Sequence, residues 1–172
     1  MVRVDVLTLI ATPAPQPSIL VLQPTEEEVS EGVSRVIPIF VGTVEAMGLG
    51  AALESLRFER PMTHDLFLDV MTNLDATIDH VLINKFKGRT FYSEMVLSQH
   101  GRLISIDARP SDSVALAIRQ QAPIYIEEDI LERASFPYIR RPSHEDESVD
   151  EEQIMARFKD FIDTISPDDF VG

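Results

Sequence analysis

The amino-acid sequence predicts an α+β fold, in which a mixed β-sheet packs with helices and a C-terminal amphipathic helix follows. Three observations predict it. Apolar segments of strand length come first in the chain, and later strands alternate with helical segments. Near the C-terminus, apolar residues recur at helical spacing after a polar stretch. With 172 residues, 44% of them hydrophobic, the chain has room for one folded body and a short appendage.

The first part of the body is predicted to be rich in β-structure. Strands are expected at 2–9, 18–23 and 34–41. The proline-rich stretch 12–17 separates the first two strands, and the acidic loop 24–32 separates the second from the third. Pro38 lies within the third strand. Because proline cannot donate a hydrogen bond to a neighbouring strand, it predicts an edge position or a bulge there.

Helices and strands then alternate. Helices are expected at 43–56, 64–74, 112–121 and 129–134. Strands are expected at 80–86, 90–97, 103–107 and 123–127. Thr43, Thr63 and Ser111 are the predicted N-caps, because a hydroxyl oxygen can accept from the unpaired N–H groups at a helix start. The small residues of the first helix predict close packing against the sheet.

The C-terminal part of the chain differs from the rest in charge. Residues 143–172 hold 2 basic and 10 acidic residues, whereas residues 1–142 hold 13 and 19. We therefore expect a body at 1–140, an acidic linker at 141–148 and a helical tail at 149–172. The acidic first turn of the tail suits the helix dipole. Its apolar face predicts docking on the same chain or on a neighbouring subunit, or binding to a partner protein.

Composition excludes several classes of protein. The absence of cysteine excludes disulfides, thiol catalysis and Cys-based zinc sites. No apolar run reaches the roughly 18 residues needed to span a membrane, and Asp5 interrupts the N-terminal one, so we expect a cytoplasmic protein without a membrane partner. The net charge of −14 opposes tight, non-specific binding to nucleic acid. Neither a Gly-Lys-Ser/Thr phosphate loop nor a Gly-x-Gly-x-x-Gly motif is present, and no organic cofactor is expected.

One segment combines several groups that can carry chemistry. It reads Ser-Ile-Asp-Ala-Arg-Pro-Ser-Asp over residues 105–112. Asp107 lies at the predicted strand end and Asp112 in the first turn of the next helix, so both carboxylates and Arg109 are expected to converge. This arrangement suits a divalent metal ion or a phosphate. In the structural alternative, Asp112 only interacts with the helix dipole while Asp107 pairs with Arg109.

A second set of candidates lies at other helix starts. His64 and Asp65 begin one predicted helix, and Glu45 lies in the first turn of the preceding one. His64 is a candidate general base or metal ligand, although a lone histidine there is commonly just exposed or hydrogen-bonded. Three helices thus begin with an acidic residue. If their N-termini meet on one side of the sheet, these residues form a single polar pocket.

A basic hairpin is the third candidate. Lys85, Lys87 and Arg89 cluster on it, with Phe86, Phe91 and Tyr92 close by. Basic residues interleaved with aromatic ones can follow a nucleic-acid backbone and stack on bases. The alternative is an ordinary solvated turn.

The motifs resemble one known family in order and spacing. The segments Arg35–Gly42, Arg60–Leu66 and Ile106–Asp112 resemble the bifunctional nuclease domain family, and the resemblance extends over about Val2–Ile139. The closing segment Phe158–Phe170 is similar to the tail of bacterial members. The resemblance implies an α+β fold, association into a homo-oligomer, and degradation of both DNA and RNA.

Our first hypothesis is a metal-assisted nuclease, a hydrolase with DNase and RNase activity. In this hypothesis Asp107 and Asp112, with Glu45, hold a divalent ion such as magnesium or manganese that polarises the phosphoryl group and activates water. His64 acts as general base or as acid for the leaving group, and Asp65 orients it.

The remaining roles concern the phosphate and the strand. Arg109 would stabilise charge on the phosphate oxygens, and the basic hairpin residues would guide the nucleic acid. The second hypothesis is a non-enzymatic regulatory module that binds an anion or a metabolite and self-associates. Convergence of Asp107, Asp112 and His64 on one point discriminates the two hypotheses.

Overall fold

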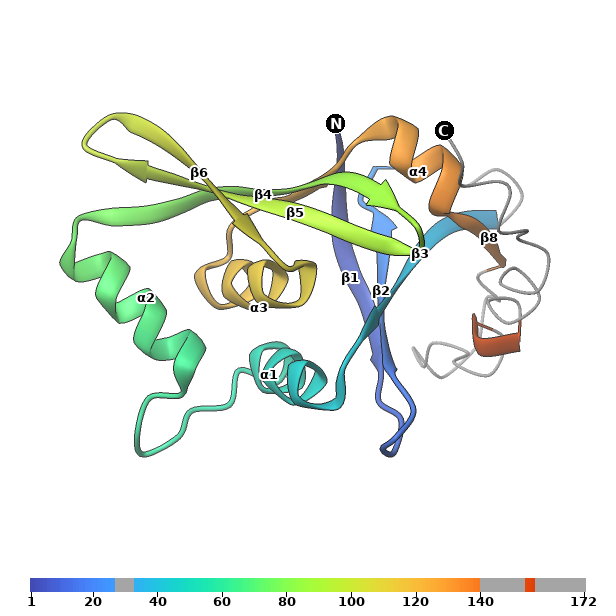
Figure 1. The fold of residues 1–172 in the computed structure, drawn as a ribbon, viewed down its shortest axis with the longest axis horizontal. Helices are drawn as coiled ribbons and strands as arrows, with labels where there is room; N and C mark the ends of the chain where they lie inside the picture. The colour runs from blue at the N-terminus through green and yellow to red at the C-terminus, as the bar shows by residue number, and fades with distance from the viewer. Residues whose placement is uncertain (27–32, 140–153, 157–172) are drawn as a thin grey trace.

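The computed structural model describes residues 1–26, 33–139 and 154–156 (Figure 1). Its strands are β1 (Val2–Ile10), β2 (Ser18–Pro24), β3 (Val33–Val41), β4 (Ala76–Lys87), β5 (Thr90–Gln99), β6 (Arg102–Ala108), β7 (Ile124–Ile126) and β8 (Phe136–Ile139). Its longer helices are α1 (Thr43–Leu53), α2 (Thr63–Asn73), α3 (Pro110–Gln120) and α4 (Glu128–Ala134). Among these residues, no helix has the length and apolar character needed to cross a membrane.

The strands form one mixed sheet in the order β6-β5-β4-β7-β1-β2-β3-β8. β4 and β7 run parallel, while the other neighbours are antiparallel. Two-residue turns join β4 to β5 at Gly88-Arg89 and β5 to β6 at His100-Gly101, and all four residues have positive φ. Such turns match the twist of a hairpin and favour glycine. The predicted α+β class with a mixed sheet is confirmed.

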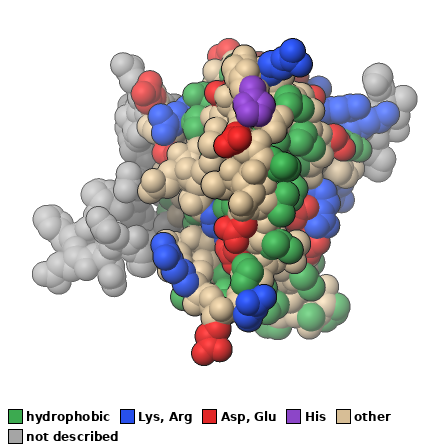
Figure 2. All heavy atoms as spheres, turned by 90° about the vertical axis from the view of Figure 1, so that its left-hand side faces the viewer, with side chains coloured by type: hydrophobic (Ala, Val, Ile, Leu, Met, Phe, Trp, Pro, Cys, Tyr) green, Lys and Arg blue, Asp and Glu red, His purple; other side chains and the backbone are tan. Residues whose placement is uncertain are grey.

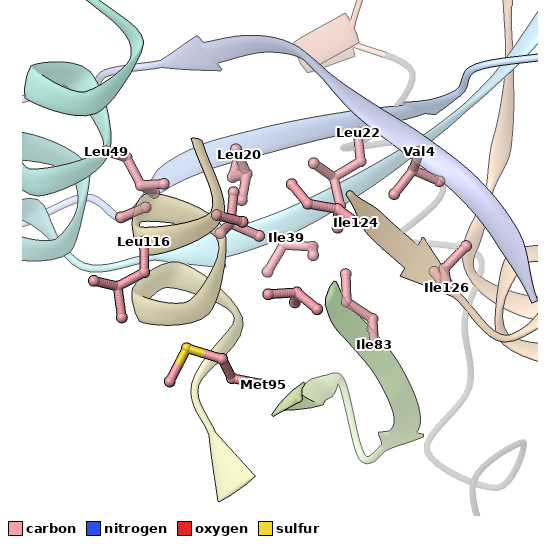
Figure 3. Close-up of a cluster of buried hydrophobic side chains, with 14 of the residues drawn as sticks. Val4, Leu20, Leu22, Ile39, Leu49, Ile83, Met95, Leu116, Ile124 and Ile126 are labelled. Carbon is pink, nitrogen blue, oxygen red and sulfur yellow. The ribbon is translucent and has the colours of Figure 1, made fainter. Parts of the chain in front are cut away.

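Helix α3 places the polar residues at its N-terminus by packing its centre into the core. Val114, Ala115 and Ala117 are completely buried, and α3 packs against β4, β5 and α1. Figure 3 shows Leu49 of α1 and Leu116 of α3 beside strand side chains of the same hydrophobic cluster. As a result α1, α2 and α3 lie on the same side of the β4–β5–β6 part of the sheet (Figure 1).

A second hydrophobic cluster lies on the other face of β2. Side chains alternate along a strand, so Leu20 and Leu22 enter the main core while Ile19 and Val21 enter this cluster. Ile154 is fully buried in it, so this part of the predicted tail docks on its own chain. The acidic linker at 141–148, most of the tail, and residues 27–32 of the acidic loop lie outside the described residues.

Helix starts differ from the prediction by one or two residues. The residues at the N-cap positions are Gly42, Met62 and Arg109, and none of the three makes a side-chain capping hydrogen bond. Thr43, Thr63 and Ser111 are therefore the first or second helical residues, and their predicted role as N-caps is wrong. At α3 the reason is Pro110, whose fixed φ and missing N–H favour the first helical position.

Two features of the sheet bear on the strand predictions. β8 pairs with residues 33–36 of β3, so Pro38 lies where β3 pairs only with β2 among the described residues. This agrees with the predicted edge position. β4 begins at Ala76 instead of residue 80, and the short strand β8 was not predicted. β8 contains a proline and has only four residues, which leaves too little alternation to detect.

Candidate active site

The first turns of α1, α2 and α3 meet and bring together Glu45, His64 and Asp112, with Arg109 at the N-cap of α3. We call these four residues the polar network. The predicted meeting of the helix starts is therefore present in the structure. The N-terminal ends of helices carry partial positive charge, which favours the two carboxylates and would also favour a bound anion.

Arg109 links two helices through its guanidinium. Its Nε donates to Asp112 Oδ2 at 2.8 Å, and its Nη1 donates to Glu45 Oε1 at 2.7 Å. The hydrogen bond with Asp112 is the largest cause that raises the pKa of Arg109 above its ordinary value, followed by the hydrogen bond with Glu45. The side chain is nevertheless 64% exposed. Arg109 thus remains charged, is held in a fixed direction and is open to a ligand from solvent.

His64 approaches the same carboxylate from α2. Its Nε2 lies 3.5 Å from Asp112 Oδ1, and its side chain is 20% exposed. The ring also lies against α1 at Gly48, where a Cβ atom would be 3.0 Å from His64 Cε1 and 3.3 Å from Nδ1. The absence of a side chain at Gly48 is therefore what leaves room for the imidazole in this position.

Asp65 does not orient His64, contrary to the prediction. Its Oδ2 accepts from the backbone N–H of Met62 at 3.0 Å, which satisfies an unpaired donor at the start of α2. Its Oδ1 accepts from Arg119 Nε at 3.1 Å. Asp65 therefore fixes the N-terminus of α2 to α3, and Asp112 is the carboxylate that lies beside His64.

Asp107 lies on the opposite side of the sheet from α3. Ser93 of β5 faces α3, because its hydroxyl is hydrogen-bonded to that of Ser113 at 2.9 Å. The next residue, Glu94, therefore faces away, and Asp107 is its cross-strand partner. The predicted convergence of Asp107 with Asp112 is wrong, since alternation along β6 directs the Asp107 side chain to the other face.

The polar network does not have the form of a metal centre. Across the described residues, no three His, Asp or Glu side chains gather closely enough to hold a metal ion. Glu45 and Asp112 instead direct carboxylate oxygens at Arg109. The residues present do not fit a protein-held magnesium or manganese ion, and the requirement for such an ion stays a prediction.

The basic hairpin lies at the β4–β5 turn, beside α4. Arg133 of α4 donates to the carbonyl of Phe86 at 3.3 Å, and Lys85 Nζ lies 5.4 Å from the centre of the Tyr92 ring. Lys87 and Arg89 are exposed. No hydrogen bond or ion pair joins Lys85, Lys87 or Arg89 to the polar network within the described part of the chain. Their role in binding nucleic acid stays a prediction.

Sequence reasoning missed two residues that support the network. Arg119 is 11% exposed, and its Nη1 donates to the carbonyl oxygens of Gly48 and Ala115, each at 3.2 Å. It thereby joins α1, α2 and α3. Arg119 follows Asp112 by seven residues, which is two helical turns, and this spacing on one face of α3 was the available signal. The sequence marked Gly48 only as one of several small residues in a helix, which did not indicate its contact with His64.

We expect Gly48→Ala to lower activity without lowering stability. The new methyl group would contact His64 at 3.0 Å and push the ring away from Asp112. Alanine within a helix is otherwise favoured over glycine by roughly 0.5–1 kcal/mol. The midpoint of thermal unfolding should therefore stay the same or rise, while turnover falls by about tenfold. A loss of both activity and stability would contradict this explanation, and Gly50→Ala, where the nearest atom is 3.8 Å away, is the control.

We expect Asp107→Asn to leave activity within about twofold of the unmodified protein, because its side chain faces away from α3. For the nuclease of the first hypothesis, the measurement is the initial rate of nucleic-acid cleavage with magnesium, with manganese and with a chelator. Asp112→Asn, measured in parallel, should be strongly impaired because Asp112 contacts both His64 and Arg109. Equal, large losses of activity in the two variants would instead support the prediction that Asp107 and Asp112 act together at one site.

Comparisons with known proteins identify relatives of this chain. The family model of the Bifunctional nuclease domain matches residues 27–138. An uncharacterized protein of Mycobacterium tuberculosis is 35% identical over 136 residues, which cover 79% of this chain and 81% of that protein. Bifunctional nuclease 2 of Oryza sativa is 27% identical over 116 residues, and Bifunctional nuclease 1 of Arabidopsis thaliana is 24% identical over 116 residues.

The plant matches cover 66% of this chain but only 34% of each plant protein. The chain thus corresponds to about a third of these relatives. The matched region includes α1, α2 and α3, whose first turns hold the polar network. This chain belongs to the bifunctional nuclease domain family.

Proposed function

We propose that this chain hydrolyses phosphodiester bonds of DNA and RNA at the polar network. The observation that carries the proposal is the position of His64 and Arg109 on either side of Asp112, where an exposed guanidinium lies next to a group that can transfer protons. Membership of the bifunctional nuclease domain family supports the same activity. The residues that match the family, 27–138, include the three helix starts.

Arg109 supplies the charge that phosphoryl transfer requires. The guanidinium donates from Nε to Asp112 and from Nη1 to Glu45, and its exposed part can approach the non-bridging oxygens of a phosphate. A charge fixed in this way stabilises negative charge that develops on those oxygens in the transition state. Glu45 acts here as a positioning residue, since it contacts Arg109 and fixes its direction.

His64 moves the proton. During hydrolysis the oxygen of water bonds to phosphorus while one P–O ester bond breaks. His64 accepts a proton from the attacking water, and the departing oxygen receives a proton, so that the products are a phosphate monoester and a hydroxyl group. Asp112 stabilises the imidazolium that forms between these events, because its Oδ1 lies 3.5 Å from Nε2. No step is assigned to a metal ion.

The charge of the protein indicates weak binding of the polymer. With a net charge of −14, the surface as a whole repels nucleic acid, so that contacts have to be local. In the proposal, Lys85, Lys87 and Arg89 supply such contacts to the phosphates, and Lys85 Nζ lies 5.4 Å from the centre of the Tyr92 ring. A hydrolase can bind nucleic acid with low affinity and still cleave it.

The test is cleavage of fluorescent single-stranded DNA and RNA by highly purified protein with magnesium, manganese or a chelator. Cleavage that disappears in His64→Ala and Arg109→Ala supports the proposal. Cleavage that persists equally in both variants would assign it to a contaminant or another site. Binding of a labelled oligonucleotide or of inorganic phosphate without cleavage under any condition would favour the non-enzymatic anion-binding module instead.

A further inference from the structure

Among the described residues, helix α2 has one apolar face that packs on the body and a second apolar face that is exposed. Met71 is 5% exposed and packs into the core, with Leu68 partly buried beside it. The second face consists of five residues between 39 and 59% exposed. We call this set the α2 stripe; it comprises Met62, Leu66, Phe67, Val70 and Leu74. Four of these residues are spaced by four positions, so they form one ridge along the helix.

The α2 stripe continues onto the edge of the sheet. Gln99 Nε2 donates to the carbonyl of Leu74 at 2.7 Å, which holds the end of α2 beside the β5–β6 turn. In β6, Ile104 and Ile106, which alternate with Asp107 and so point to the side of the sheet that α3 covers, are 40 and 37% exposed. Figure 2 views this side of the molecule and shows hydrophobic side chains gathered in a band that runs from top to bottom. Soluble monomers rarely leave contiguous apolar surface beyond a few hundred Å² uncovered.

We propose that the α2 stripe is an interface with a second copy of this chain, in which the two α2 helices pack antiparallel. The charges at the two ends of α2 are what favour a second copy. Arg57 and Arg60, with Glu59 between them, precede the helix, and Asp65 in its first turn is paired with Arg119 of the same chain, whereas Asp75 follows its last turn. An antiparallel pair brings the arginines of one copy towards Asp75 of the other at both ends.

The even spacing of the α2 stripe also lets it pair with the same stripe of a second copy that runs in the opposite direction. In an antiparallel pair centred on the stripe, Met62 lies opposite Leu74 of the second copy, and Leu66 lies opposite Val70. The antiparallel helix dipoles attract each other in this arrangement. A parallel pair would instead place like charges and like helix ends together.

The first experiment measures mass by sedimentation velocity over about 1–200 μM full-length chain. We expect an assembly larger than the 19.3 kDa monomer. Val70→Asp should raise the dissociation constant at least about tenfold, because it buries a charge in the interface. Val44→Asp is the matched control, since Val44 is 78% exposed on α1 and should leave the assembly unchanged. Circular dichroism should show both variants folded.

The second experiment uses the absence of cysteine in the chain. Single-cysteine variants Leu66→Cys and Val70→Cys are mixed and oxidised, and the 66–70 heterodisulfide should form faster than either homodisulfide. Predominant Met62→Cys homodisulfides would indicate parallel helices and overturn the antiparallel arrangement. A monomer at every concentration, or an assembly that Val70→Asp and Val44→Asp affect equally, would overturn the interface itself. None of these results depends on nuclease activity.

Discussion

Replacing His64 by alanine is expected to reduce hydrolysis of DNA and RNA by about 10²–10⁴-fold, the usual contribution of a positioned acid–base group. The loss should appear in kcat and less in KM, because in the proposed mechanism Arg109 and the basic hairpin hold the substrate without His64. His64 is partly exposed and its ring packs against Gly48 without filling the main core, so the fold should survive its removal. Single-turnover cleavage of a labelled oligonucleotide is the appropriate measurement.

A matched pair of variants separates the role of His64 from a general loss of histidine. His64→Asn and His100→Asn make the same chemical change, but His100 lies exposed at the β5–β6 turn with a positive φ that asparagine tolerates. Only the former should lose activity. If His64→Asn kept more than about half of the turnover while Asp112→Asn lost it, Asp112 would act without His64 and the assignment of the proton transfer would be wrong.

The general position of the site could be predicted because helix starts leave a local signature. Glu45, His64 and Asp112 each lie in the first turn of a helix that the sequence predicts, and Arg109 precedes Pro110 at the third of them. What brings the three starts together is the packing of α1 and α2 on α3. That packing depends on contacts far apart in sequence, such as the pair of Glu45 with Arg109.

The partners within the site could not be predicted for two different reasons. The direction of Asp107 depends on strand register, and a shift of one residue moves a side chain to the opposite face. The direction of Asp65 depends on competition between His64, one residue away, and Arg119, which is far along the chain. Asp65 pairs with Arg119 because Arg119 is largely buried on α3, where a charged group requires a partner.

Replacing Arg109 has the second of the two largest expected effects, because this residue has both a chemical and an organising role. Arg109→Ala removes the charge that would face the phosphate, and removal of one such group typically costs about 10²–10³-fold in kcat. It also leaves Glu45 and Asp112 without the cation that both contact. The carboxylates would then repel an approaching phosphate, so the loss in kcat/KM should exceed the loss in kcat.

Arg109→Lys tests whether charge alone is sufficient. A lysine retains the positive charge, but its single ammonium group cannot present the planar fork that bonds Asp112 through Nε and Glu45 through Nη1. We therefore expect lysine to restore substrate binding more than turnover, with kcat still reduced by at least about tenfold. Glu45→Gln, which keeps an oxygen acceptor for Nη1 and removes one negative charge, should lower activity much less than Arg109→Lys. Full recovery of kcat in Arg109→Lys would show that the fixed geometry of the guanidinium is dispensable, and that Arg109 only attracts the substrate.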